Sequence, residues 1–263
     1  MSEPDGSGQP AAVHYERQGA AALVTIDRQH RRNAVDGPTA AALHDAYLRF
    51  EAEEEARVLV LTGAGGVSFC AGADLKATGT FVERLMSEEG PMGFTRLTPS
   101  KPTIAAISGF CLAGGLELAL WCDLRIAAEG SMLGYPERRW GVPLIDGGTQ
   151  RLPRIVGLGR ALDLILTGRL VGAGEALAMG LLTEVVASGA HLERALALAH
   201  GLARFPQRTM LADRRAAIEG LGKTLAEGLA LEAEAGPEVF EDGARGAARF
   251  AAGEGRGGAG AGA

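Results

Sequence analysis

The sequence predicts an α/β fold with extensively buried strands. Continuously apolar runs at residues 22–26, 58–61 and 103–107 have the length of strands that are covered on both faces. A segment with helical periodicity lies between the first two runs, and glycine clusters follow the later ones. Strands that alternate with helices in this way are typical of α/β proteins.

Local sequence patterns predict the secondary structure of the first part of the chain. Strands are expected at residues 13–15 and 22–26, with a glycine turn between them. A helix is expected over residues 38–55, because apolar residues recur there at intervals of three and four. Its acidic end should be solvated. The next strand, at 58–61, is expected to stop at the glycine-rich turn 63–66.

The later elements are less regular. We expect a variable, mobile helical region at 78–98, and then strand 103–107, helix 116–121 and strand 124–127. The segment 138–157 is rich in turn residues. Beyond it, the patterns predict helices at 158–165 and 192–202, with a short helix and a strand ending at Val186 between them.

Four regions are expected along the chain. The turn-rich residues 1–11 and the Gly/Ala-rich residues 252–263 should be disordered. Residues 12–205 should form the α/β core, and residues 206–251, which lack strand-like runs, should form a helical module.

Composition excludes several classes of protein. The 263 residues carry 32 acidic and 26 basic side chains, a net charge of -6, without the basic stripe of a nucleic-acid-binding protein. No apolar run approaches the roughly 18 residues that a membrane span needs, and the acidic N-terminus does not resemble a signal peptide. Three cysteines without metal-ligand spacing suit a reduced interior. We therefore expect a soluble cytoplasmic protein that needs no metal.

The segment 101–137 carries the candidate active site. Gly114 and Gly115 precede the helix at 116–121, whose first amides lack intrahelical partners, so this turn can bind developing negative charge. Glu117 lies just inside that turn, and Glu137 follows 20 positions later. Two non-catalytic readings stay open. Glu117 could simply stabilise the helix dipole, and Glu137 could pair with Arg138 or Arg139.

Five motifs together resemble the crotonase superfamily, and within it the enoyl-CoA hydratases. The resemblance covers roughly residues 13–250. It rests on RRNAV, FCAGADLK, IAAISGFCLAGGLELALWCDLRIAAE, YPE and GGTQRLPRIVG, in that order. It implies a spiral of ββα units with a C-terminal α-helical module, assembled as a homotrimer or homohexamer. It also implies an acyl-CoA thioester as substrate and no further cofactor, because coenzyme A is part of the substrate.

The resemblance also assigns roles to residues. It implies that the backbone N–H groups of Ala73 and Gly114 form an oxyanion hole, that Glu117 activates water, and that Glu137 protonates C2 of the substrate. The residues that it places against the acyl-CoA are Arg32, Ala71, Ala73, Asp74, Leu75, Lys76 and Gly114. Arg32 belongs to a cluster with Arg28 and Arg31, any one of which could meet a CoA phosphate or simply be solvated.

Three departures from the family pattern leave the activity open. Arg138 and Arg139 follow Glu137 and could lower its pKa. Asp146 stands where hydratases usually have glycine or alanine, and is either an additional acid or a partner of a nearby arginine. Ala113 replaces a glycine, with little effect expected. The reaction implied first is hydration of a trans-2-enoyl-CoA; the alternatives are a Δ3,Δ2-enoyl-CoA isomerase with one working glutamate and a catalytically silent acyl-CoA-binding protein.

Overall fold

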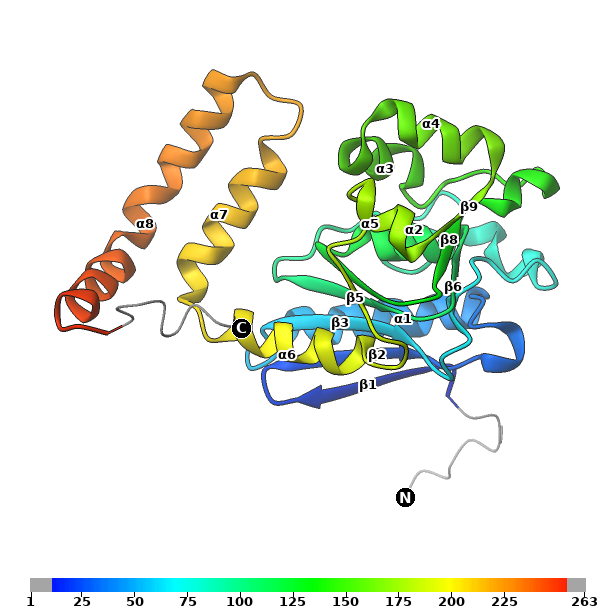
Figure 1. Ribbon diagram of the computed structural model, residues 1–263, viewed down its shortest axis with the longest axis horizontal. Helices are drawn as coiled ribbons and strands as arrows, with labels where there is room; N and C mark the ends of the chain where they lie inside the picture. The colour runs from blue at the N-terminus through cyan, green and yellow to red at the C-terminus, as the bar shows by residue number, and fades with distance from the viewer. Residues whose placement is uncertain (1–10, 255–263) are drawn as a thin grey trace.

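Two β-sheets form the centre of the molecule (Figure 1). The computed structural model describes residues 11–254, so most of both expected disordered ends lies outside the described residues. The larger sheet has the strand order β1-β2-β3-β5-β7-β10, and only β1 runs antiparallel to its neighbour. Its strands are β1 (Val13–Gln18), β2 (Ala21–Ile26), β3 (Val58–Gly63), β5 (Thr103–Ile107), β7 (Leu124–Ala128) and β10 (Glu184–Val186).

The smaller sheet has the order β4-β6-β8-β9. Its strands are β4 (Ser68–Cys70), β6 (Phe110–Leu112), β8 (Met132–Gly134) and β9 (Leu170–Gly172). The pairs β3/β4, β5/β6 and β7/β8 are consecutive in the chain, so three successive units each give one strand to each sheet. Between β5 and β6 the chain turns at Gly109, with φ +62°, where a Cβ would stand 1.9 Å from the carbonyl oxygen of Val67. Only glycine fits this crossing.

The helices cover both faces of the larger sheet. Alternate strand residues point to opposite faces, so β3 gives Val58 and Val60 to the cluster under α6 (His191–Ala203), and Leu59 and Leu61 to the core that includes α1. The remaining helices are α1 (Gly37–Ala52), α2 (Gly114–Trp121), α3 (Gly148–Val156), α4 (Leu158–Thr167) and α5 (Ala173–Ala178), with 3-10 helices η1 (Gln29–Arg31), η2 (Thr78–Arg84) and η3 (Pro136–Trp140).

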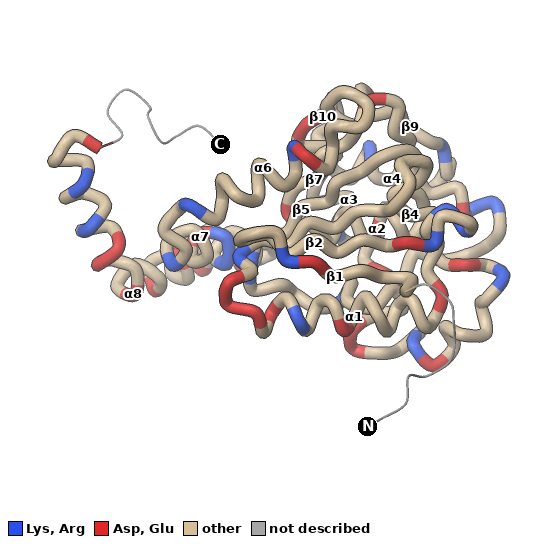
Figure 2. The backbone as a smooth tube through the Cα atoms, turned by 90° about the horizontal axis from the view of Figure 1, so that it is seen from below, with Lys and Arg blue, Asp and Glu red and all other residues tan. Residues whose placement is uncertain are grey.

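The C-terminal helices α7 (Gln207–Glu219) and α8 (Leu225–Ala251) form a hairpin that stands apart from the sheets (Figure 1). α8 begins with a capping box between Thr224 and Glu227. Lysine and arginine are interspersed with acidic residues along the described chain (Figure 2). None of the helices in residues 11–254 has the length and hydropathy needed to cross a membrane.

The α/β class and the longer strands are confirmed, one local prediction holds only in part, and several short elements were not predicted. The expected helical region at 78–98 is helical only in the 3-10 helix η2; turns follow it, and Gly90 and Gly93 there adopt positive φ. The turn-rich segment contains η3 and α3. The strands of the smaller sheet, three residues each, were not predicted because such short runs carry no periodicity.

Gly115 fixes helix α2 against β4. A Cβ at this position would stand 2.1 Å from the carbonyl oxygen of Cys70, a backbone atom that cannot move aside. We therefore predict that Gly115→Ala lowers the free energy of unfolding by about 3 kcal/mol or more. Gly159→Ala in α4 is the matched control, because nothing lies within 4 Å of its added Cβ, and alanine should stabilise that helix by about 0.5 kcal/mol. Urea denaturation measures both; equal effects would contradict this packing.

Candidate active site

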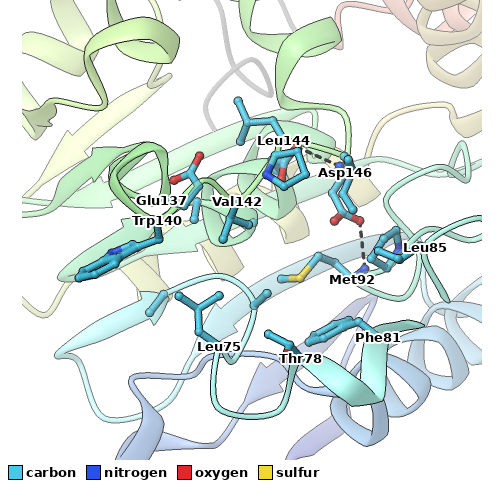
Figure 3. A pocket seen from close by; sticks show the side chains of 18 of the residues that line it. Leu75, Thr78, Phe81, Leu85, Met92, Glu137, Trp140, Val142, Leu144 and Asp146 are labelled. Carbon is cyan, nitrogen blue, oxygen red and sulfur yellow. Dashed lines mark hydrogen bonds between the residues drawn. The ribbon is translucent and has the colours of Figure 1, made fainter. Parts of the chain in front are cut away.

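A cavity of about 460 Å³ lies beside the carboxyl ends of the smaller sheet. Figure 3 shows Glu137 and Trp140 at one end of it, Asp146 and Leu85 at the other, and Leu75, Thr78 and Phe81 along a third side. Its wall is almost entirely apolar; the exceptions with ionisable side chains are Glu117, Glu137 and Asp146. Ala71, Ala73, Leu75 and Gly114 also line it, so most of the predicted site residues meet in one place.

Strand register brings the two predicted amide donors together. In the parallel pair β4 and β6, Cys70 is opposite Cys111, and Ala73 and Gly114 each follow three residues later. A Cβ on Gly72 would stand 2.9 Å from the nitrogen of Gly114, so the two segments touch. Within the described residues, neither the Ala73 nor the Gly114 N–H donates a hydrogen bond. Both are free to bind an oxygen.

Ala113 holds the turn before α2 in an unusual conformation. Its backbone has φ 54° and ψ -128°, a conformation that residues other than glycine rarely adopt. Such a residue typically stores about 1–3 kcal/mol of strain. Glycine would relieve this strain, so the departure at Ala113 has a local cost, while its small side chain still leaves the Gly114 amide open to the cavity.

Glu117 is held rigidly although it is buried, with 2% of its surface exposed. Its Oε1 accepts hydrogen bonds from the backbone N–H groups of Asp146, at 3.0 Å, and Gly148, at 2.8 Å. A Cβ on Gly148 would stand 2.9 Å from Oε1, so the approach of this amide requires glycine. The other oxygen of Glu117 receives no hydrogen bond from the described residues, and the side chain lines the cavity.

Glu137 has a different environment. It is 6% exposed, and neither carboxylate oxygen has a hydrogen-bond partner within the described residues. Arg138 and Arg139 are exposed, and Arg138 donates from Nε to the carbonyl of Ile165 in α4. The ion pair with either arginine, the alternative reading of Glu137, is therefore absent from the described chain, and Glu137 faces the cavity unpaired.

Burial raises the pKa values of both glutamates toward neutral pH. It raises the pKa of Glu117 to about 8, aided by the nearby Asp146 and opposed by the two amide donors. It raises the pKa of Glu137 to about 7, opposed by the residue's own backbone amide and then by Arg138. Because the two groups also repel each other, the pair retains one proton near neutral pH. Burial and Asp146 favour the proton on Glu117, which has the higher pKa, whereas its two amide hydrogen bonds favour its ionised form, so the single proton can occupy either carboxylate.

Asp146 ties two walls of the cavity together. Its Oδ1 accepts from the backbone N–H of Met92 at 3.0 Å and from the Thr95 hydroxyl. Its own amide donates to Glu117, and Arg151 donates to its carbonyl oxygen at 3.0 Å. Burial raises the pKa of Asp146, while Thr95 and Met92 lower it. No side-chain ion pair joins Asp146 to an arginine in the described chain.

Three predicted contact residues do not line the cavity. Asp74 is buried and pairs with Arg28 at 3.2 Å, and its Oδ1 accepts from the Lys76 amide. The Lys76 side chain is exposed. Arg32 is exposed and stacks over the ring of Phe110 at 5.3 Å. Arg28 is committed to Asp36 and Asp74, which leaves Arg31 and Arg32 as the more open cations of this cluster.

Sequence reasoning missed the cavity wall built from residues 81–92 and 140–145. Its apolar side chains come from the short 3-10 helices η2 and η3 and from the irregular segments that follow them, where no periodicity marks them. Among residues 11–254, no three or more His, Cys, Asp or Glu side chains are arranged to hold a metal ion.

Comparisons with known proteins agree with this geometry. The family model for enoyl-CoA hydratase/isomerase matches residues 16–252. A probable enoyl-CoA hydratase from Rhizobium meliloti is 39% identical over 90% of this chain and 93% of its own length. The crystal structure of enoyl-CoA hydratase EchA1 from Mycobacterium marinum has a TM-score of 0.86 at 37% identity, covering 91% of this chain and 95% of that one. The carnitinyl-CoA hydratase from Mycobacterium avium has a TM-score of 0.76 at 38% identity, covering 92% and 96%.

The family match spans the two sheets, the cavity and the helical hairpin, and the similarity to the Rhizobium meliloti and Mycobacterium marinum proteins extends over nearly the whole of each. The chain therefore belongs to the enoyl-CoA hydratase/isomerase family of the crotonase superfamily and is most like the enoyl-CoA hydratases.

Proposed function

We propose that the protein adds water across the double bond of a trans-2-enoyl-CoA and releases a 3-hydroxyacyl-CoA. One observation carries the proposal: two buried carboxylates and two free backbone amides line a single apolar cavity. This set supplies a base, an acid and an anion site, which are the groups that hydration of an enoyl thioester needs.

The amides of Ala73 and Gly114 bind the thioester oxygen in this account. Attack at C3 moves electrons onto that oxygen and produces an enolate. Donors that are already aimed at the oxygen in a dry site stabilise the developing charge, and loss of one such donor typically costs about 3–4 kcal/mol. The in-register ends of β4 and β6 keep the donors in place without a side chain.

The glutamates divide the proton transfers. Glu117 accepts a proton from water as the water oxygen bonds to C3, and Glu137 donates its proton to C2 of the enolate. One water is consumed, and the pair again holds one proton, now on Glu117, which returns to Glu137 before the next turnover. Asp146 acts as a positioning residue in this scheme, because its side chain already accepts two hydrogen bonds.

The lining of the cavity favours an apolar acyl chain. Apart from the three carboxyl groups, the side chains facing it are aliphatic, aromatic, proline, methionine and one threonine. Similar proteins are named for short-chain enoyl-CoA and for carnitinyl-CoA. We propose that the substrate carries an uncharged acyl group and not one with a quaternary ammonium. We also propose that the CoA phosphates lie near Arg31 and Arg32. We further propose a cytoplasmic homotrimer or homohexamer that takes part in fatty acid metabolism and needs no further cofactor.

The alternative of a catalytically silent acyl-CoA-binding protein assumes that arginines neutralise Glu137. Arg138 and Arg139 do not contact its carboxylate, which removes the premise of that alternative. The isomerase alternative needs only one working glutamate, so variants of each glutamate distinguish an isomerase from a hydratase.

The first prediction concerns the two glutamates. Glu117→Gln and Glu137→Gln should each lower kcat for hydration of crotonyl-CoA by about 10²- to 10⁴-fold, because each removes one proton-transfer group. KM should change little. The loss of ultraviolet absorbance of the conjugated thioester measures the rate. Glu129→Gln, at an exposed glutamate outside the cavity, is the matched control and should behave as wild type.

The same variants test the isomerase alternative. If either variant loses hydration of crotonyl-CoA but still isomerises a 3-enoyl-CoA at the wild-type rate, and wild type prefers the 3-enoyl substrate, the hydratase assignment is wrong.

The second prediction concerns pH. The pair works only while it holds one proton, and burial raises the pKa values of Glu137 and Glu117 to about 7 and about 8. We expect kcat/KM for crotonyl-CoA to be highest between these values. It should fall below them, where both groups are protonated and no base remains, and above them, where both are ionised and no acid remains. A rate that stays constant to pH 10 would contradict the shared proton.

A further inference from the structure

Tyr135 carries a buried hydroxyl that has no role in the scheme above. The residue follows β8, directly before Pro136 and Glu137, and none of its surface is exposed. Its Oη has no hydrogen-bond partner among the described residues. Buried hydroxyl groups in folded proteins are nearly always hydrogen-bonded, so an orphan of this kind points to a function.

Gly148 shows what the hydroxyl is aimed at. A Cβ built on Gly148 would stand 2.7 Å from Tyr135 Oη and 2.9 Å from Glu117 Oε1. Both oxygens therefore lie against Gly148, whose amide already donates to Glu117 at 2.8 Å. Register explains this placement: Leu112 in β6 is opposite Gly134 in β8, so Tyr135 and the first turn of α2 leave the sheet side by side.

We infer that Tyr135 is a positioning residue for Glu117: its hydroxyl donates a third hydrogen bond to the Glu117 carboxylate whenever that carboxylate is ionised. This inference rests on the proposed function only for its catalytic consequence, since the hydrogen bond itself can be measured without substrate.

The charged and titratable groups around the hydroxyl support Glu117 as the acceptor. The groups that act on Tyr135 are Glu117 of α2, Glu137 of η3, Cys111 of β6 and Arg151 of α3. Burial, followed by Glu117, raises the pKa of Tyr135 well above its usual value, so the hydroxyl keeps its proton and can only donate to a carboxylate. Arg151 does not compete, because its guanidinium donates to the carbonyl oxygens of Asp146 and Thr95.

A third donor answers a need of the mechanism. Glu117 must be ionised to accept a proton from water, yet burial and the neighbouring Asp146 oppose ionisation. Two backbone amides oppose that effect only in part. A hydroxyl that bonds to the ionised form would lower the pKa of Glu117 toward the working range without placing a second charge in the cavity.

The test is a carbon-13 NMR titration of the Glu117 carboxyl group in the full-length protein without substrate, assigned by its absence in Glu117→Gln. Tyr135→Phe should raise the pKa of this group by about one unit, a tenfold change in its acid dissociation constant. Tyr47→Phe is the matched control. Tyr47 is also buried, but its hydroxyl donates to the Thr98 carbonyl and does not line the cavity. It should leave the titration unchanged.

Three results would overturn the inference: an unchanged Glu117 titration in a folded Tyr135→Phe, a shift confined to Glu137, or an equal shift in Tyr47→Phe. If Tyr135→Phe does not fold, 3-fluorotyrosine at position 135 replaces it. Its more acidic hydroxyl donates a stronger hydrogen bond and should lower the pKa of Glu117, and no lowering would again overturn the inference. None of these readouts requires turnover. An inactive wild-type protein would therefore refute the proposed hydratase activity without affecting the test of the hydrogen bond from Tyr135.

Discussion

The site depends on one contact, the pair of backbone amides that hold the buried carboxylate of Glu117. A charged group with 2% of its surface exposed is costly unless donors replace its water. The amides of Asp146 and Gly148 are such donors, and they come from the segment that enters α3. Their position determines that Oε1 of Glu117 is hydrogen-bonded and that the other oxygen is left without a donor from the described residues. The sheets, helix α2 and the turn before α3 must all be in place for this contact to form.

Small residues and backbone groups determine most of the geometry of the site. Gly115 lets α2 touch β4, Gly148 lets an amide reach Glu117, and Gly72 lets the two oxyanion segments approach. The proposed anion site and the anchor of the base are therefore both made of main-chain N–H groups. The parallel strands β4 and β6 lead into the first pair, and the segment that enters α3 carries the second. Side chains supply what the main chain cannot. Glu137 presents a buried carboxyl group without a hydrogen-bond donor among the described residues, and Asp146 joins the loop at Met92 to the anchor of Glu117.

Sequence reasoning reached the parts of this account that are local. The strands at 22–26, 58–61 and 103–107 were predictable because their apolar runs are continuous, and the glycines before Glu117 marked a helix start with open amides. Helix α3 was hidden by Pro153 and two glycines, and the strands of the smaller sheet are too short to show a period. The unpaired state of Glu137 was not predictable, because the direction that Arg138 takes depends on α4, far along the chain. The position of Tyr135 beside Gly148 likewise exists only in three dimensions.

The central claim is that Glu117 and Glu137, in one cavity, deliver the elements of water to the two carbons of one double bond. Hydration of crotonyl-CoA in D₂O, followed by proton NMR of the 3-hydroxyacyl product, tests it most directly. The account predicts one deuterium at C2, on the same face as the new hydroxyl at C3, because both groups act on a substrate held by Ala73 and Gly114. Deuterium on both faces of C2, or on the face opposite the hydroxyl, would contradict the account.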